Sequence, residues 1–442
     1  MHWQPDGPTP GVPSAGDLRR RSFLKLLVGN SVWLAAGSRL ASAVGGFQVG
    51  VGSSADPYAA TERAVSACEQ WPAASIAGQT VVIKPNLVGP APAPTGITTD
   101  PQVVRALVDL ALAAGAVQVI VIEGGVGQPK PAPFGVCGYS FFNSYDPRVQ
   151  LIDLANQPVT LANVPGGFAY RALYLPTLVL DPSVVFISVG KLKTHINSGA
   201  SLTMKNLFGL AAPVNYSVPN QILPRVNLHY RGVDLSIVDL NLARPVHFGV
   251  IDGIWAMQGN GPFNGTPVQM NLVLAGVNPV AVDRVGVQAM GIPQNAIQHL
   301  AYAASRGMGP WNSSAVTLLG DSFTPAAFVP AQTAPLLWRP VPFPATISLS
   351  AGQQTTLYYN VPVGCQTRVE IIQDSDVTPG ITLVRTLHDW TPRPAGTEAV
   401  AWNGLDDNGA PVSPGVYLAR AQARYSANAA LNYATNFVTV TA

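Results

Sequence analysis

The residues most able to do chemistry lie in one segment of nineteen residues, Lys191–Gly209 (KLKTHINSGASLTMKNLFG). It holds three lysines, a histidine and two asparagines, in a chain whose charged residues make up only 11% of the total. Cationic side chains are costly to bury without partners, so such a cluster indicates a nearby anion or metal. The segment therefore predicts a binding site for a small molecule or a cofactor.

Within this segment, two residues are the candidate catalytic groups. His195 could be a general acid or base, or a metal ligand, and otherwise is a hydrogen-bonded structural histidine. Lys205 could be a base or a Schiff-base nucleophile, because a lysine desolvated among like charges has a lowered pKa. Lys191 and Lys193, with Lys205, could clamp a carboxylate or phosphate, and Asn206 joins them as a ligand-binding candidate.

The remaining candidates follow the ends of other expected strands. Lys84 and Asn86 follow the strand 81–83, where they could recognise an anion or be a surface lysine and a turn-capping amide. Glu123 and Asp252 each end a strand and could bind a cation, take a proton or simply pair with the lysines. Because parallel strands end along one edge of a sheet, these side chains are expected to meet the lysine segment there. Four other histidines, His229, His247, His299 and His388, are scattered and receive no ligand role.

The elements that must position these residues alternate between strands and helices, which predicts an α/β domain with a mostly parallel sheet and flanking helices. One helix is well marked, because Asp100 is a good N-cap, Pro101 suits the first turn and Gly115 ends the pattern. Other expected strands are 47–51, 117–122, 184–189, 250–251, 271–275 and 316–319, and other expected helices are 57–70, 280–290 and 296–305. Asp283 is expected to order a loop or cap a helix. From about Pro340 short alternating runs predict an all-β, immunoglobulin-like sandwich.

The N-terminus predicts export. Arg20 and Arg21 lie in a twin-arginine pattern (RRSFLK), followed by an apolar run and by Ala41-Ser42-Ala43, a signal peptidase site. The expected organisation is a signal peptide over 1–43, the α/β domain over 44–322, a linker over 323–343 and the sandwich over 344–442. The expected location is periplasmic or extracellular, with the twin-arginine export machinery as a partner; a retained anchor is the alternative.

Net charge and cysteine content exclude some classes of ligand and cofactor. The formal net charge is +2 and no basic stripe exceeds the N-terminal one, which argues against nucleic-acid binding. The three widely spaced cysteines exclude a cysteine-ligated iron–sulfur cluster and leave open one disulfide or buried free thiols. The sequence leaves open whether the protein binds a metal or a covalently held cofactor.

Three groups of motifs resemble the family catalogued as domain of unknown function 362. They are VIKPNL (82–87) with TTDP (98–101), the segment Lys191–Gly209, and IDGIWAMQGNG (251–261) followed by VNPVAVD (277–283). The resemblance covers about Phe47–Gly320 and implies the fold rather than a reaction. Some members of the family carry ferredoxin-like cysteine motifs, which are absent from this sequence.

Two further resemblances are narrower. His195 and Lys205, ten residues apart with Ser198-Gly199-Ala200-Ser201 between them, have the spacing seen in nickel-pincer lactate racemases, where the lysine carries the cofactor. The rest of that metal-ligand pattern is not present. The stretch WNGLDDNG (402–409) followed by PGVY (414–417) resembles the immunoglobulin-like modules of flagellar hook-capping (FlgD-like) proteins.

Three hypotheses follow. The first is an exported protein that binds an anionic small molecule or a metal-containing cofactor at the strand-end site and can do acid–base chemistry there. The second is a non-catalytic extracellular binding or surface-assembly protein, which finds a protein partner through its C-terminal module. The third is a structural role, in which internal carboxylates pair with the clustered lysines.

Overall fold

The computed structural model describes residues 46–124, 132–217, 225–374 and 381–442. The proposed signal peptide, residues 1–43, lies outside these ranges. The three cysteines, Cys68, Cys137 and Cys365, are all buried as free thiols. Across the described ranges, we find no helix that is both long and apolar enough to cross a bilayer.

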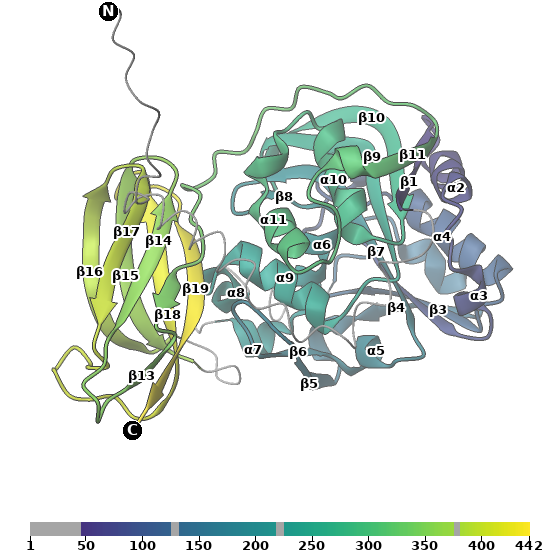
Figure 1. The fold of residues 1–442 in the computed structure, drawn as a ribbon. Coiled ribbons are helices and arrows are strands. Elements are labelled where there is room, and N and C mark those ends of the chain that lie inside the picture. Colours follow the sequence, from purple (N-terminus) through teal and green to yellow (C-terminus); the bar gives the residue numbers. More distant parts are fainter. Residues whose placement is uncertain (1–45, 125–131, 218–224, 375–380) are drawn as a thin grey trace, which may run out of the picture. The chain divides into compact units, whose positions relative to one another are not determined.

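A large sheet of nine strands dominates the first three quarters of the described chain (Figure 1). Its order is β11-β1-β10-β9-β7-β2-β3-β4, with the short β8 paired to β7. Five of the pairings are parallel, namely β1 with β11, β7 with β9, β2 with β7, β2 with β3, and β3 with β4. The strands are β1 Phe47–Ser53, β2 Thr80–Lys84, β3 Gln118–Glu123, β4 Val149–Asp153, β7 Val185–His195, β8 Gly199–Ala200, β9 Phe248–Asn260, β10 Asn264–Gly276 and β11 Val316–Gly320. The α/β class with a mostly parallel sheet is thus confirmed.

Helices cover both faces of this sheet because its strands are apolar on both sides. Along β2, Val82 belongs to one buried core, whereas Val81 and Ile83 belong to the other. The first core includes residues of α6, α9 and α10, and the second includes residues of α2 and α4. The helices are α2 Pro57–Ala67, α3 Ala73–Ile76, α4 Pro101–Ala113, α5 Thr177–Leu180, α6 Leu202–Asn206, α7 Pro213–Tyr216, α8 Val226–Tyr230, α9 Val233–Ala243, α10 Pro279–Ala289 and α11 Gln298–Ser305.

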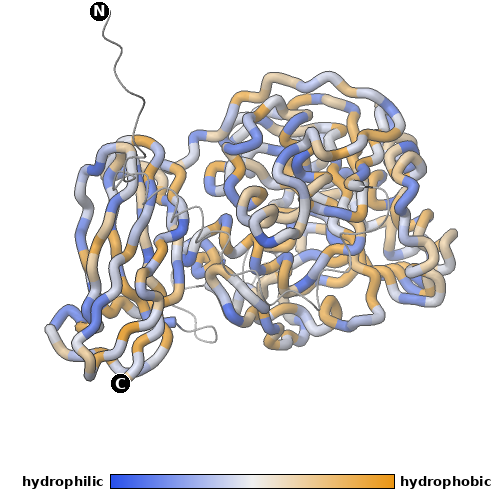
Figure 2. Tube along the Cα trace, viewed as in Figure 1, coloured by the Kyte–Doolittle hydropathy of each residue, from blue (hydrophilic) through white to orange (hydrophobic). Residues whose placement is uncertain are grey.

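Beyond about residue 340 the described chain is all β. One sheet has three strands, β12 Val341–Phe343, β14 Thr355–Val361 and β17 Gly396–Trp402. The other has five, β13 Thr346–Ser348, β19 Asn432–Thr441, β18 Gly415–Arg424, β15 Cys365–Gln373 and β16 Leu383–Arg393. Buried and half-buried residues alternate along β14, and short apolar and polar stretches follow one another along the strands of this region (Figure 2). A separate pair, β5 Val159–Asn163 and β6 Ala172–Pro176, is antiparallel.

One expectation from the sequence needs correction. Strand β7 does not stop near Val189 but continues to His195, so Lys191 and Lys193 lie on the strand itself. It continues because it stays paired with β9 beyond Gly190, with a register shift between Lys191 and Lys193. Within the expected linker, 323–343, the last three residues form β12, which pairs with β14.

Candidate functional site

A pocket of about 200 Å³ opens where β2, β3 and β7 end. Helices α6 and α8 and the turn between β9 and β10 complete its wall. The lining residues are Lys84, Asn86, Val88, Glu123, Lys193, His195, Ile196, Asn197, Ser201, Lys205, Asn206, Phe208, Gly209, Arg225, His229, Pro262 and Phe263. Of the nine site residues expected from the sequence, seven line this pocket, and Lys191 and Asp252 do not.

Lys191 and Asp252 instead form a fully buried ion pair. The Lys191 ammonium lies 2.7 Å from an Asp252 carboxylate oxygen, and neither side chain is exposed. The register of the sheet places them directly opposite each other on β7 and β9. Asp252 also accepts hydrogen bonds from the backbone N–H groups of Asp100 and Ile254, at 2.7 and 2.9 Å. The pair therefore joins β7, β9 and the start of α4, away from the pocket.

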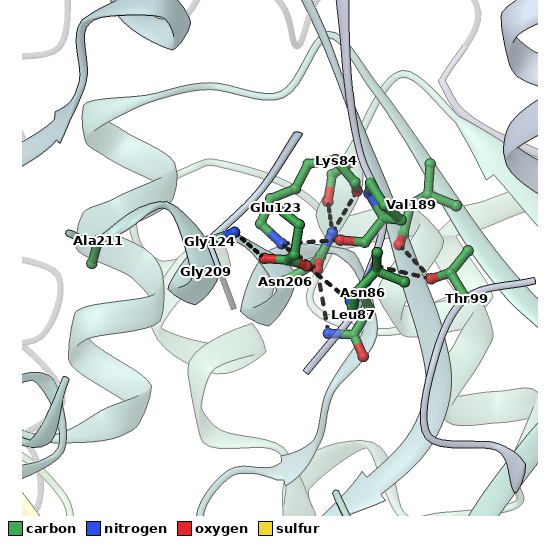
Figure 3. Close-up of polar contacts among 12 residues, drawn as sticks. Lys84, Asn86, Leu87, Thr99, Glu123, Gly124, Val189, Asn206, Gly209 and Ala211 are labelled. Carbon is green, nitrogen blue, oxygen red and sulfur yellow. Dashed lines mark hydrogen bonds and ion pairs between the residues drawn. The ribbon is translucent and has the colours of Figure 1, made fainter. Parts of the chain in front are cut away.

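Lys84 and Glu123 form a second buried pair, and this one lies in the pocket wall (Figure 3). Lys84 donates to Glu123 at 3.0 Å and to the Asn206 side-chain oxygen at 3.1 Å. Glu123 also accepts from the backbone N–H groups of Leu87 and Gly124, at 2.8 and 2.7 Å. Asn206 donates to the Lys84 carbonyl at 2.9 Å, so its amide is engaged at both ends. Burial lowers the pKa of Lys84, an effect that Glu123 opposes. This network rigidifies the wall and leaves little of Lys84 for a ligand.

Lys193 is buried without a carboxylate. Its ammonium donates to the Asn86 side-chain oxygen at 2.7 Å and to the Ile97 carbonyl at 2.6 Å. Lys193 is only 1% exposed. Both acceptors are neutral, and within the described residues Lys193 forms no ion pair. Burial lowers the pKa of Lys193 well below its ordinary value, and the charges of Lys191 and Lys205 lower it further. Asn86 is thus the residue that positions this lysine.

Lys205, on α6, has a different environment. It is half-buried, and its ammonium lies 4.5 Å from the centre of the Phe208 ring. Within the described residues it has no hydrogen-bond or ion-pair partner. Burial lowers the pKa of Lys205 to about 8, an effect that Asp234 opposes and that the charges of Arg225 and Lys84 support. A half-buried amine with this pKa can carry a proton near neutral pH.

Two histidines in the wall are held neutral. Burial, followed by the charges of Lys205 and Lys193, lowers the pKa of His195 well below its ordinary value. The His195 Nδ1 accepts a hydrogen bond from the Asn197 backbone N–H at 3.0 Å, which leaves the proton on Nε2. Burial and Lys205 lower the pKa of His229 to about 4. Both rings can therefore donate or accept a hydrogen bond without adding charge.

Sequence reasoning assigned no site role to two basic residues of the wall, Arg225 and His229. Arg225 is buried and donates to the carbonyls of Ala211, Gly209 and Gly124, at 2.5, 3.1 and 3.4 Å. Burial lowers the pKa of Arg225 to about 10. Neither residue follows a strand or lies in a motif, so no local signal in the sequence pointed to them.

The comparisons with known proteins bear on this part of the chain. Residues 81–288 match the family model described as Domain of unknown function (DUF362). Every residue that lines the pocket lies within this DUF362 match. The motif resemblance found in the sequence is confirmed over this stretch, which is shorter than the expected Phe47–Gly320.

One curated relative and two solved structures complete the comparison. The thylakoid-associated protein Sll1697 of Synechocystis sp. is 28% identical over 249 residues, which cover 53% of this chain and 70% of that protein. FlgD from P. aeruginosa is 22% identical with a TM-score of 0.16, over 20% of this chain and 61% of that one. The CARDB domain of the PF1109 protein from Pyrococcus furiosus is 18% identical with a TM-score of 0.16, over 24% and 94%. At these TM-scores neither structure establishes a shared fold.

The DUF362 match also contains the residue that fixes α6. Asp283, on α10, is fully buried and accepts hydrogen bonds from the Thr203 and Met204 backbone N–H groups at 2.8 and 3.0 Å. It also accepts from the Thr203 hydroxyl at 2.5 Å. These are donors of the first turn of α6, which would otherwise lack partners. The helix-capping role expected for Asp283 is thus confirmed, and it caps the helix that carries Lys205.

Among the described residues, no group of three or more histidine, cysteine, aspartate or glutamate side chains is arranged to hold a metal ion. The pocket wall offers two neutral histidines and one carboxylate, and that carboxylate is already paired with Lys84. The described lining of this pocket therefore does not fit a metal-ligand set.

Gly209 gives a first testable prediction about the wall. A Cβ added there would lie 2.7 Å from the Lys84 ammonium and 2.8 Å from a Glu123 carboxylate oxygen. We expect Gly209→Ala to force this pair apart and to lower the free energy of unfolding by about 1–3 kcal/mol, the usual cost of overpacking. Chemical denaturation measures it. Gly415→Ala is the control, since its Cβ would meet nothing within 4 Å; equal stability of the two variants would contradict the prediction.

Proposed function

We propose that this pocket binds a small anionic molecule. The observation that carries the proposal is Lys193, whose buried ammonium is held only by two neutral oxygens among the described residues. A buried charge without a counter-charge is costly, and proteins retain one mainly where it has a use. A carboxylate or phosphate in the pocket would supply the missing charge.

The charges of the whole wall support the same ligand. The lining residues include four basic side chains, Lys84, Lys193, Lys205 and Arg225, against one carboxylate, Glu123. Because Glu123 pairs with Lys84, it does not neutralise Lys193 or Lys205, the two lysines that the described residues leave without a carboxylate. Val88, Ile196, Pro262 and Phe263 add apolar surface, which strengthens electrostatic attraction by excluding water.

Acid–base chemistry is the finer part of the proposal. Lys205 titrates near neutral pH, and His195 is neutral with its proton on Nε2. A proton could therefore pass between a bound anion and Lys205, which is the proton carrier that we propose. The Nε2–H of His195 would donate a hydrogen bond to the same anion.

We further propose that the protein is exported, to the periplasm or beyond, on the strength of the twin-arginine pattern at residues 20–25. The two C-terminal sheets, of three and five strands, would form the immunoglobulin-like sandwich. Such a module could engage an extracellular protein partner.

Isothermal titration calorimetry of the full chain with inorganic phosphate and with oxalate tests the anion site. We expect saturable, salt-sensitive binding of at least one of them, because the wall has excess positive charge. Sodium chloride at matched ionic strength is the control for screening alone. Absence of heat with both anions, together with an unchanged melting temperature, would overturn the proposal.

The pH dependence of anion binding gives a second prediction. The folded-state pKa of Lys205 is about 8, so its positive charge is present below pH 8 and is lost as pH rises through that value. We expect affinity for oxalate, which is fully ionised throughout, to fall about tenfold between pH 7 and pH 9, as a charge-assisted hydrogen bond is lost. The measurement is the same titration repeated across this range.

Lys205→Arg is the matched control for the pH series. A guanidinium keeps its charge across this range, so the step centred near pH 8 should vanish. A variant that retains the full step would show that another group titrates.

A further inference from the structure

Lys205 is the lysine of this site that the described residues leave without a fixed partner. Lys191 and Lys84 are each paired with a carboxylate, and Lys193 is held by two oxygens. The Lys205 ammonium instead faces the Phe208 ring and lines the pocket. A lysine among other cations loses its proton more easily, and its pKa of about 8 agrees with that.

The use of lysine across the chain is a second, independent observation. The sequence contains nineteen arginines but only six lysines, and four of those six are Lys84, Lys191, Lys193 and Lys205. Where only a positive charge is needed, this chain almost always has arginine. A guanidinium keeps its proton and is a poor nucleophile, whereas a primary amine can lose its proton and react. The concentration of lysine here suggests that an amine is required in at least one position.

We propose that Lys205 is a nucleophilic amine that forms an imine with the carbonyl group of a small aldehyde or ketone bearing a carboxylate or phosphate. This inference rests on the proposed anion site, because the excess positive charge of the wall would hold the anionic end of that molecule. It adds the chemical class of the ligand, a carbonyl-bearing anion, and a covalent step.

The step is balanced within the pocket. The lone pair of the neutral Lys205 amine attacks the carbonyl carbon, which forms a C–N bond and moves the C=O electron pair onto oxygen. The two amine protons leave with that oxygen as water, and the carbon–nitrogen double bond remains. The departing oxygen takes up the two protons lost by the amine, and the Nε2–H of His195, which lines the same pocket, can donate a hydrogen bond to that oxygen.

Reductive trapping tests the proposal directly. The full chain is incubated at pH 7.5 with glyoxylate, a small aldehyde with a carboxylate, and with sodium cyanoborohydride. The hydride reduces an imine at its carbon and leaves a stable carboxymethyl group on the lysine nitrogen. Intact mass and peptide mapping then locate the modification. At this pH an amine of pKa about 8 has roughly 200-fold more of its neutral form than one of pKa 10.5.

We expect Lys205 to be labelled first and faster than Lys25 or Lys130, with a rate that rises through pH 8 and falls when inorganic phosphate competes. Lys205→Arg should lose this label, because a guanidinium forms no imine under these conditions. Equal labelling of all lysines, or labelling elsewhere, would overturn the imine proposal and leave the anion site intact. Failure of phosphate and oxalate to bind the wild type would instead overturn the anion site itself.

Discussion

Replacement of Lys191 by methionine is expected to lower the free energy of unfolding by about 3–5 kcal/mol, the cost of removing one partner of a buried ion pair. The Lys191 ammonium lies 2.7 Å from Asp252, and both side chains are fully buried. Methionine has a similar length and leaves little cavity, so the loss would come from the unpaired Asp252 carboxylate. Denaturant unfolding at pH 7 measures it.

The control for this prediction removes both charges. Lys191→Met with Asp252→Asn keeps a neutral side chain that can still accept from the Ile254 backbone N–H. It should recover at least half of the lost free energy, because no buried charge remains unpaired. A Lys191→Met variant that loses less than about 1 kcal/mol would contradict the assignment of Lys191 to structure.

Local signals predicted the parts of the fold that depend on local chemistry. Helix α4 begins after Asp100, whose carboxylate accepts from the Gln102 N–H at 2.8 Å, and Pro101 occupies its first position. The strand ends at Lys84 and Glu123 were also apparent, because an apolar run stops at a charged residue in both cases. These signals need only a few neighbouring residues.

The different environments of Lys191, which pairs with a carboxylate, and Lys193, which does not, could not be predicted from local signals. Both lie on β7, two residues apart, and the sequence gives them the same role. The pairing with β9 decides between them, since it sets Asp252 opposite Lys191 and Met257 opposite Lys193. Lys191 and Asp252 lie 61 positions apart in the chain, so the residues near either one do not indicate their contact.

The same reason explains why Arg225 and His229 were missed. They come from the start and the body of α8, a five-residue helix without a motif, and tertiary packing brings them to the ends of β2 and β3. Asp283 was expected to order a loop or cap a helix, although Asn278 is the N-cap of its own helix, α10. Its partner, the first turn of α6, became known only from the structure.

The second large effect is expected at Lys193, where methionine should abolish most anion binding without loss of stability. Removal of the buried ammonium relieves a desolvation cost of several kcal/mol, whereas the loss of two donors to Asn86 and Ile97 costs about 1–3 kcal/mol. The free energy of unfolding at pH 7 should therefore be equal to or above that of the wild type. Affinity for oxalate should fall at least tenfold, since a charge-assisted hydrogen bond contributes about 1.5–3 kcal/mol.

The pH dependence of stability sharpens this test. Because the folded-state pKa of Lys193 is lowered, the unfolded chain binds more protons between that pKa and 10.5, and wild-type stability rises with pH through this window. Lys193→Met lacks this rise, so its advantage over the wild type should shrink as pH approaches 10.5. Lys191→Met should be measured in parallel. It replaces a lysine of the same strand, but it should lower the free energy of unfolding strongly at pH 7. If both variants lose stability equally and Lys193→Met still binds oxalate, Lys193 is a structural residue and the anion site is not built around it.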